Sequence, residues 1–257
     1  MQIYDKNHAL EHDIYHIFNI FDSQIPLVIM SKCEQCIIRQ FNSLQHLTKE
    51  ELVKISNCKT TKVIKKGEAI FEEGERLKGV FCIKDGVCKV SKMSENGRNQ
   101  IISLVTKGDL LGERSLISDE ASNLKAVALN DMQVCFIPKE EILKDLSKNP
   151  NFTMNVLKDM AQTLKQADNV IVDMAQKTVK QRLAETLLKL HKKFGTNREG
   201  TIDIHLSRED IANIIGTATE SAIRLLSELK KKNIIEFKGK DISILNSIEL
   251  DKIAQGF

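Results

Sequence analysis

The chain has 257 residues, of which 42% are hydrophobic and 28% are charged. This ordinary globular composition is enough for one large domain or two small ones, and it excludes a disordered or collagen-like chain. No apolar run is long enough to cross a membrane, and the first residues lack the features of a secretory signal. We therefore expect a cytoplasmic protein with no membrane partner. Six cysteines are too few for a disulfide scaffold, so free thiols or a metal site are expected.

The net charge of +3 is unevenly distributed along the chain. Residues 176–240 carry 14 Lys and Arg against 8 Asp and Glu. A basic block in an otherwise slightly acidic chain favours a part that binds a polyanion, although many solvated helices carry as much charge.

Residues 1–30 are predicted to form an amphipathic helix, because apolar side chains recur along one face at helical spacing. The opposite face carries three histidines one turn apart: His8, His12 and His16. Such a row can chelate a metal or haem, but the polar face of an ordinary helix is the simpler interpretation. We assign residues 1–32 to an N-terminal helical extension.

Residues 60–137 alternate short β-rich runs with turn signals. Asp85-Gly86 and Asn96-Gly97 each lie between two such runs, and each predicts a hairpin turn. Several short strands at this spacing predict an all-β sandwich or a barrel-like roll. We assign residues 33–150 to a sensor domain built on this roll.

A long helix is predicted next, over residues 151–178. Its apolar residues alternate spacings of three and four, as in the seam of a coiled coil: Leu157, Met160, Leu164, Ala167, Ile171 and Met174. The helix could instead pack on its own domain. A long helix between two domains has little else to bury against, however, so we expect a parallel homodimer.

Residues 179–257 are predicted to form helices followed by a basic hairpin, which is the pattern of a winged helix-turn-helix. Gly195 is a stop signal for the first helix, and Ser207 is the expected N-cap of the second. Thr217 and Glu220 have the spacing of a capping box for the third helix.

The third helix is expected to enter a DNA groove. Glu220 can accept a hydrogen bond from cytosine, Arg224 can bind guanine, and Ile223 can touch a thymine methyl group. Basic residues around them would hold phosphates. The predicted DNA contacts are Arg208, Thr219, Glu220, Ser221, Ile223, Arg224, Lys238 and Lys240. Two alternatives stay open: Glu220 acts only as a capping residue, or it forms a plain surface ion pair with Arg224.

The phrases IKDGVCKV, KGDLLGE and LSREDIANIIGTATESAIRLLSELKKKNII make the chain similar to the Crp–Fnr family of bacterial transcription regulators over residues 33–250. The resemblance implies an α+β fold: an antiparallel β-roll of the cyclic-nucleotide-binding type, a long dimerisation helix and a C-terminal winged helix-turn-helix. The third helix resembles the E-x-x-S-R pattern of the Fnr branch, with Ile223 in place of the serine. A palindromic site with TTGAT-like halves is therefore implied.

The resemblance implies two kinds of signal. The cyclic-nucleotide branch holds a ligand phosphate with a Gly-Glu turn and an Arg-Ser pair about ten residues later. The corresponding effector pocket here would be Gly112, Glu113, Ser122 and Asn123, and it lacks the arginine. A buried phosphate needs a cation or several well-aimed donors, so the sequence disfavours a cyclic nucleotide.

The iron–sulfur branch uses four cysteines. The resemblance maps Cys33 and Cys36 to the first pair and Cys135 to the ligand in the roll. The remaining ligand is expected about six residues after Cys36, where Phe41-Asn42 stands instead. Because such clusters are normally held by four thiolates, the three matched positions leave a gap.

Cys58, a residue other than cysteine, or a small molecule would have to fill that gap. Cys82 and Cys88 flank the Asp85-Gly86 turn and are interpreted as strand residues. A chain without a cluster, with inert or redox-active thiols, is the alternative.

We expect a homodimeric, sequence-specific DNA-binding transcription regulator whose sensor domain responds to oxygen or redox state, with RNA polymerase as a further partner. An enzyme is not expected. No His lies between His46 and His191 to serve a cupin-type metal site, and no nucleophile elbow or phosphate-binding loop is present. The alternative is a ligand-binding regulatory module that acts through protein partners or a cyclic-nucleotide-type effector.

Overall fold

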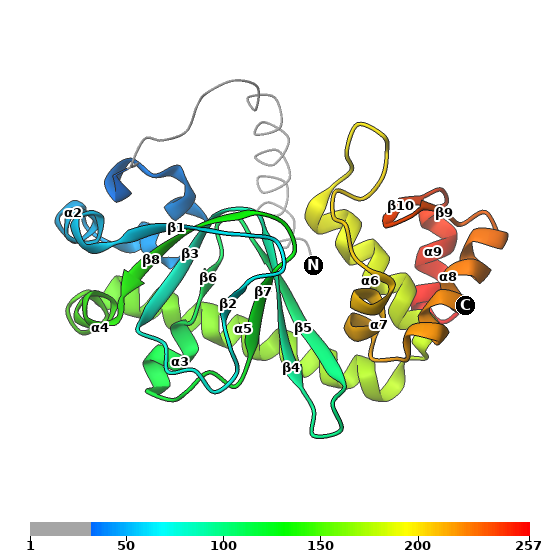
Figure 1. The fold of residues 1–257 in the computed structure, drawn as a ribbon, viewed down its shortest axis with the longest axis horizontal. Helices are drawn as coiled ribbons and strands as arrows, with labels where there is room; N and C mark the ends of the chain where they lie inside the picture. The colour runs from blue at the N-terminus through cyan, green and yellow to red at the C-terminus, as the bar shows by residue number, and fades with distance from the viewer. Residues whose placement is uncertain (1–31) are drawn as a thin grey trace, which may run out of the picture. The chain divides into compact units, whose positions relative to one another are not determined.

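The computed structural model describes residues 32–257, in which Cys33–Phe257 form one compact unit. Figure 1 shows a β-roll, a long helix and a small helical domain that ends in a hairpin and a last helix. This arrangement confirms the predicted α+β fold. The helix predicted over residues 1–30, with its three histidines, lies outside the described residues. Within the described residues, no helix is both long and apolar enough to span a membrane.

Of the described residues, those before the strands form three 3-10 helices and one α-helix: η1 (Cys33–Gln35), η2 (Ile37–Phe41), η3 (Ser43–His46) and α2 (Lys49–Cys58). A capping box fixes where α2 begins. The Glu51 N–H donates to Thr48 Oγ1 at 3.3 Å, and the Thr48 N–H donates to the Glu51 carboxylate at 2.8 Å.

The roll consists of two four-stranded antiparallel sheets. The first has the order β1-β8-β3-β6: β1 (Thr60–Ile64), β8 (Met132–Pro138), β3 (Gly79–Asp85) and β6 (Leu110–Leu111). The second has the order β2-β7-β4-β5: β2 (Ala69–Phe71), β7 (Lys125–Ala128), β4 (Val87–Met93) and β5 (Asn99–Thr106). The short helix α3 (Glu113–Ser118) lies between β6 and β7 in the chain.

Most side chains of β3 and β8 are buried. Because successive side chains point to opposite faces of a sheet, each strand contributes to two cores. One face contributes to an inner core within the roll: Phe71, Leu77, Phe81, Ile83, Cys88, Val90, Val105, Leu111, Ala126, Ala128, Met132 and Val134. The other face contributes to an outer core beneath the helices: Ile38, Leu44, Leu47, Leu52, Ile55, Val80, Cys82, Leu116, Cys135, Ile137, Ile142, Phe152 and Val156. The first sheet therefore separates two hydrophobic cores.

The two Gly-containing turns behave differently. At Asn96-Gly97 the strands β4 and β5 pair as the predicted hairpin, with Met93 opposite Asn99. The hairpin predicted at Asp85-Gly86 is wrong, because β3 and β4 belong to different sheets. Gly86 has a φ of +92°, which lets the chain bend from one sheet into the other.

Helices α4 (Lys139–Lys148) and α5 (Pro150–Gln176) follow the roll. The C-terminal domain then contains α6 (Val179–Phe194), α7 (Arg208–Ile215), α8 (Thr219–Lys231), β9 (Ile235–Lys238), β10 (Asp241–Ile244) and α9 (Ser247–Gln255). Gly195 and Ser207 cap α6 and α7 as predicted. The capping box predicted for Thr217 is wrong: the Thr217 N–H bonds to the Ala212 carbonyl and closes α7, so Ala218 is the N-cap of α8.

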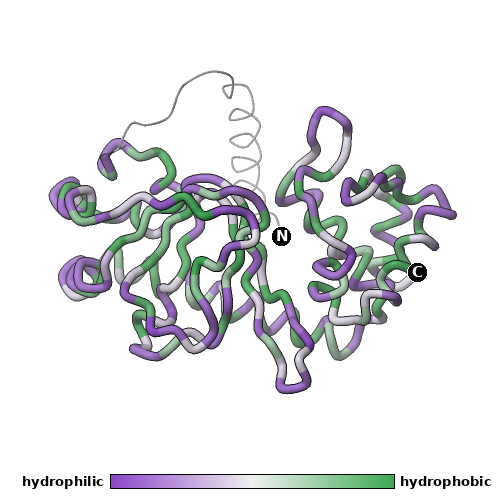
Figure 2. The backbone as a smooth tube through the Cα atoms, viewed as in Figure 1, coloured by the Kyte–Doolittle hydropathy of each residue, from purple (hydrophilic) through white to green (hydrophobic). Residues whose placement is uncertain are grey.

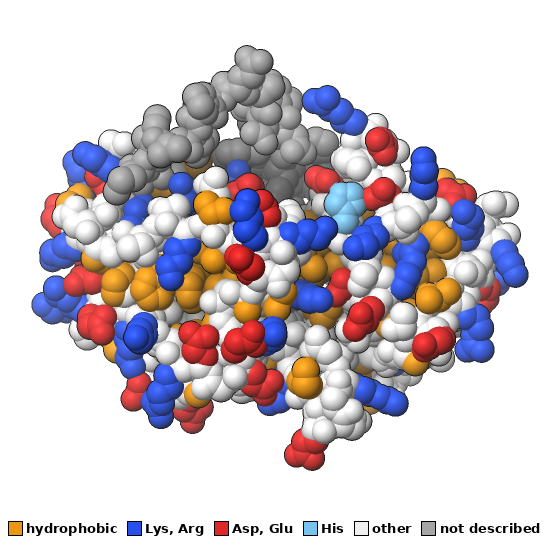
Figure 3. Space-filling view, in the orientation of Figure 1, with side chains coloured by type: hydrophobic (Ala, Val, Ile, Leu, Met, Phe, Trp, Pro, Cys, Tyr) orange, Lys and Arg blue, Asp and Glu red, His pale blue; other side chains and the backbone are white. Residues whose placement is uncertain are grey.

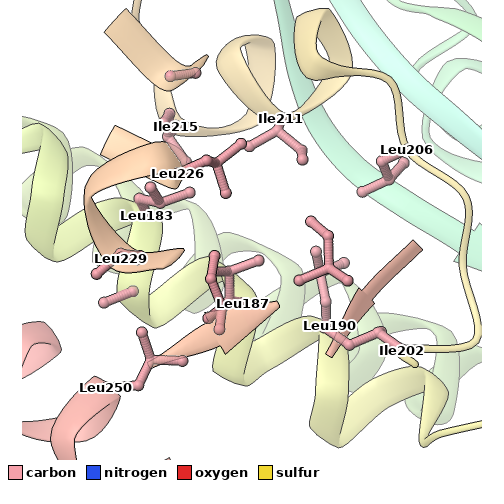
Figure 4. Packing of buried hydrophobic residues seen from close by; sticks show 14 of the residues in the cluster. Leu183, Leu187, Leu190, Ile202, Leu206, Ile211, Ile215, Leu226, Leu229 and Leu250 are labelled. Atoms are coloured by element: carbon pink, nitrogen blue, oxygen red, sulfur yellow. The ribbon is translucent and has the colours of Figure 1, made fainter. Parts of the chain in front are cut away.

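Leucine and isoleucine side chains fill the C-terminal core, where they point toward one another from α6, α7, α8 and α9 (Figure 4). Figure 2 shows hydrophobic residues along the helices and strands that enclose the cores, whereas the tip of the β4–β5 hairpin is hydrophilic. The fold thus consists of a β-roll and a separate helical core, joined by α5.

The two glycine turns provide a test of the bend between the sheets. Both Gly86 and Gly97 have positive φ, so alanine at either position costs about 1 kcal/mol in backbone strain. A Cβ on Gly86 would also lie 2.8 Å from the Asp131 carbonyl oxygen, whereas a Cβ on Gly97 meets nothing within 4 Å. We expect Gly86→Ala to lower the free energy of unfolding by roughly 2–4 kcal/mol in denaturant titrations, and Gly97→Ala by much less. Equal losses would contradict the crowded bend.

Candidate functional site

Helices α7 and α8 form a helix-turn-helix around buried apolar residues. Ile211, Ala212 and Ile215 of α7 share the C-terminal core with Ala222, Leu226 and Leu229 of α8. Gly216 joins the helices in a left-handed conformation with a φ of +66°. This packing fixes which side of α8 faces outward.

The outward side of α8 carries Glu220, Ile223 and Arg224, which we call the reading face. All three are exposed, and the Ile223 side chain is 46% accessible. Thr219 and Ser221 are half-buried at its border. Within residues 32–257 no ion pair joins Glu220 to Arg224, and the N-cap of α8 has no side-chain cap bond. The reading face therefore presents an acceptor, a cationic donor and an apolar group to solvent.

Strands β9 and β10 pair antiparallel as a wing, with Lys238 opposite Asp241. Lys238 and Lys240 at its turn are exposed. Arg208 is placed differently from what its predicted phosphate contact suggests: its guanidinium lies 4.5 Å from the centre of the Phe237 ring, and Nη2 donates to the Gly239 carbonyl at 2.8 Å. Burial lowers the pKa of Arg208. Its side chain braces the wing against α7.

Basic side chains are scattered over the face that Figure 3 draws, among acidic and hydrophobic ones, and several lie on the C-terminal domain. Some of them are engaged within the protein. Lys230 contacts the Phe237 ring and pairs with Glu236, and Lys180 pairs with Glu228 at 2.6 Å. The wing lysines and Arg224 are thus better placed than Lys230 to meet a polyanion.

An ion pair joins the helix-turn-helix to the roll. Lys89 Nζ on β4 lies 2.5 Å from Asp210 Oδ1 on α7. Burial alone would raise the pKa of Asp210, but its bonds to Lys89 and Ser207 and the charge of Lys89 lower it. Gln100 adds a hydrogen bond to the Ile214 carbonyl at 3.2 Å. Sequence reasoning missed this contact, because no local pattern marks Lys89 as a partner of Asp210.

The predicted seam of α5 is largely exposed in the single chain. Leu157, Leu164 and Ile171 are 54%, 64% and 66% accessible. Ala167 is also exposed, and Met160 and Met174 are half-buried. The structure thus leaves an apolar stripe on a helix of 27 residues that the chain's own described residues cover only at Met160 and Met174.

In the candidate effector pocket, Ser122 and Asn123 form hydrogen bonds to other residues of the chain. Ser122 is buried, and its Oγ donates to the Leu124 carbonyl at 2.8 Å. The Asn123 side chain accepts a bond from Arg114, the nearest arginine to the Gly-Glu turn. Gly112 is the left-handed N-cap of α3. Burial raises the pKa of Glu113 to about 7, and the charges of Asp159 and Asp109 add to the rise.

Four cysteines meet at the outer core. Cys82 and Cys135 are buried within it, and Cys33 and Cys36 pack against it half-buried. The structure thus brings together the three cysteines mapped from sequence and adds Cys82. Cys58 lies at the end of α2, where its thiol donates to the Ile55 carbonyl at 3.5 Å.

Electrostatic interactions among these side chains also indicate that they lie near one another. Burial raises the pKa of the Cys82 thiol to about 12, and the charges of Cys135, Cys36 and Cys33 add to the rise. Burial lowers the pKa of Lys59, but a hydrogen bond with Cys33 and the negative charge that Cys33, Cys135 and Cys36 carry as thiolates raise it overall. Within the described residues, no three His, Cys, Asp or Glu side chains are close enough together to hold a single metal ion.

Comparison with known proteins agrees with this architecture. The cyclic nucleotide-binding domain family matches residues 61–149, and the Crp-like helix-turn-helix domain family matches residues 181–253. The chain is 32% identical over 226 residues to the fumarate and nitrate reduction regulatory protein of Vibrio cholerae, covering 86% of this chain and 90% of that protein. It is 33% identical over 230 residues to the protein of the same name from Yersinia pestis, with the same coverage.

Among solved structures, FixK2 from Bradyrhizobium japonicum matches with a TM-score of 0.68 and 25% identity, covering 76% of this chain and 96% of that one. The fold, the helix-turn-helix and these relatives together define a DNA-binding transcription regulator with an N-terminal sensory domain. The chain belongs to the Crp–Fnr family.

The burial of Glu113 can be tested through the pH dependence of the free energy of unfolding. Because its pKa rises from 4.5 to about 7 on folding, the folded chain keeps a proton that the unfolded chain releases. Stability is therefore lost as the pH rises from about 4.5 to 7. We expect Glu113→Gln to raise the free energy of unfolding at pH 8 by roughly 1–3 kcal/mol relative to wild type and to leave it unchanged at pH 4. The exposed Glu120→Gln serves as the control; a gain of the same size there would contradict this account.

Proposed function

We propose that the protein is a homodimer that binds a palindromic DNA site with two copies of α8 and responds to redox state through its roll. The observation that carries the proposal is the reading face: three adjacent side chains with distinct base-recognising chemistry stand exposed on a helix held by a buried core. The relatives' name, which refers to regulating two reductions, supports the redox part.

Each side chain of the reading face has a stated role. Arg224 donates two hydrogen bonds to the O6 and N7 atoms of guanine, and Glu220 accepts one from the amino group of cytosine. Ile223 contacts a thymine methyl group. Thr219 and Ser221 border the same face and contact the DNA nearby. The combination fits a TTGAT-like half-site, which contains both a G·C pair and thymines.

Contacts with phosphates come from the exposed lysines of the wing. Lys238 and Lys240 are exposed and positively charged, and as phosphate contacts they position the domain but read no sequence. Arg208 has a double role in this proposal: it braces the wing through Gly239 and presents positive charge beside it. RNA polymerase is the further partner that a promoter-bound regulator meets.

The stripe on α5 supports a homodimer. A second copy would cover Leu157, Leu164 and Ile171 with the same residues, since a parallel coiled coil pairs identical positions. The pair of α5 helices would also set the distance between two copies of α8, about one DNA turn for a palindrome. A change in the sensor domain that shifts α5 would alter this distance and hence DNA binding.

Specific reading by Arg224 is testable by titration. We expect Arg224→Ala to lose about 1–3 kcal/mol of discrimination at one base pair of a TTGAT-like palindrome, measured against sites with single substitutions. Lys238→Ala is the control: it should weaken binding to all sequences alike and lower the slope of affinity against salt by about one. Unchanged discrimination by Arg224→Ala would refute its role.

The dimer is testable with the exposed seam residues. Leu164→Asp with Ile171→Asp should raise the dimer dissociation constant more than about a hundredfold, because charges would be buried without partners. Both side chains are exposed in the single chain, so the variant should still fold. Gln162→Asp, on the opposite face of α5, should leave sedimentation unchanged. A double variant that still sediments as wild type would overturn the seam.

A further inference from the structure

Cys82 and Cys135 are directly opposite each other in the first sheet. The antiparallel pairing of β3 with β8 places Cys82 opposite Cys135, between the pairs Phe81–Phe136 and Ile83–Val134. Directly opposed residues project from the same face of a sheet, with their Cβ atoms about 4.5–5.5 Å apart. Both cysteines belong to the outer core, whereas Phe81, Ile83 and Val134 belong to the inner core. The two thiols therefore share one buried face.

Cys33 and Cys36 approach the same face from the segment before α2. They lie in η1 and at the N-cap of η2, and both pack against the outer core. The position of Cys33 is fixed by its backbone N–H, which bonds to Ser56 Oγ at 2.5 Å. Two pairs of thiols thus converge, one from the rigid sheet and one from the chain that covers it.

Asn42 stands six residues after Cys36, where a further cysteine was expected. Its side chain points toward Cys82. Nδ2 donates to the Gly108 carbonyl at 2.8 Å and lies 3.6 Å from Cys82 Sγ. The Cys82 thiol therefore reaches the space beside the position at which the expected cysteine is missing.

We propose that Cys82 supplies the fourth thiolate of an iron–sulfur site whose other ligands are Cys33, Cys36 and Cys135. Four soft thiolates suit iron–sulfur clusters and zinc. The described thiols are too widely spaced to share one ion, and a cluster bonds its thiolates to different irons, which stand farther apart. On binding, each thiol gives its proton to solvent as its sulfur bonds to iron. Lys59 beside the thiols offsets part of the negative charge of this set.

The site rests on the proposed redox response and names the group that would carry it. Cys58 is a weaker candidate, because its thiol bonds within α2 and, unlike Cys33 and Cys36, it does not pack against the outer core. Cys88 is buried, as Cys82 is, but belongs to the inner core, on the far side of the first sheet. It therefore provides a matched control.

The test is anaerobic reconstitution of the full chain with ferrous iron and sulfide, followed by iron and sulfide analysis and a visible spectrum. We expect wild type and Cys88→Ser to bind iron and sulfide in equal amounts, and Cys82→Ser to lose most of both. Cys58→Ser should behave as wild type. If Cys82→Ser keeps its iron, if Cys88→Ser or Cys58→Ser loses as much, or if wild type takes up zinc but no iron with sulfide, the proposal is overturned.

A rescue variant separates ligation from folding. Asn42→Cys places a thiol beside Cys82, so Asn42→Cys in the Cys82→Ser chain should restore most of the iron and the visible absorbance. Failure to restore iron in a double variant with wild-type circular dichroism would count against the shared location. DNA binding is measured separately on each protein: wild type that binds iron but no DNA would refute the proposed function and leave the site standing.

Discussion

The pairing of β3 with β8 is the constraint on which most of the sensor domain depends. The apolar residues of these strands face one or the other of two cores, so both faces fix the register at once. A slip of one residue would exchange the faces, bringing Cys82 and Cys135 into the inner core and large apolar side chains beneath α2. The same register that buries Phe81 and Ile83 thus presents the two thiols to the N-terminal segment.

The C-terminal domain has a different requirement: it must keep polar side chains of α8 exposed while its apolar side chains form a core. The buried side chains of α7 and α8 meet across Gly216, and this leaves the reading face outside the core. Arg208 shows the limit of that separation: it belongs to the basic surface and also supports the wing through Phe237. Substitutions on the reading face should therefore change recognition, whereas those at Arg208 should change the wing as well.

Local signals predicted the elements well where they were periodic or marked by caps, as for α5, for Ser207 and for the Asn96-Gly97 hairpin. The same kind of signal failed at Asp85-Gly86, because a turn dipeptide does not say whether the next strand returns or enters another sheet. The site was predicted in part. Three thiols were found through a resemblance, but Cys82 could be placed only once the strand register was known, and Lys89 only once the two domains were seen in contact.

The ion pair between Lys89 and Asp210 has a consequence for how ionic strength acts on the protein. Contacts with phosphates depend on displaced counterions, so they weaken steeply as salt rises. A largely buried pair such as Lys89–Asp210 is screened much less. Rising salt would consequently strip the protein from its DNA before it loosened the attachment of α7 to the roll. The molecule would leave the duplex with its sensor and its reading domain still coupled, ready to rebind in the same arrangement.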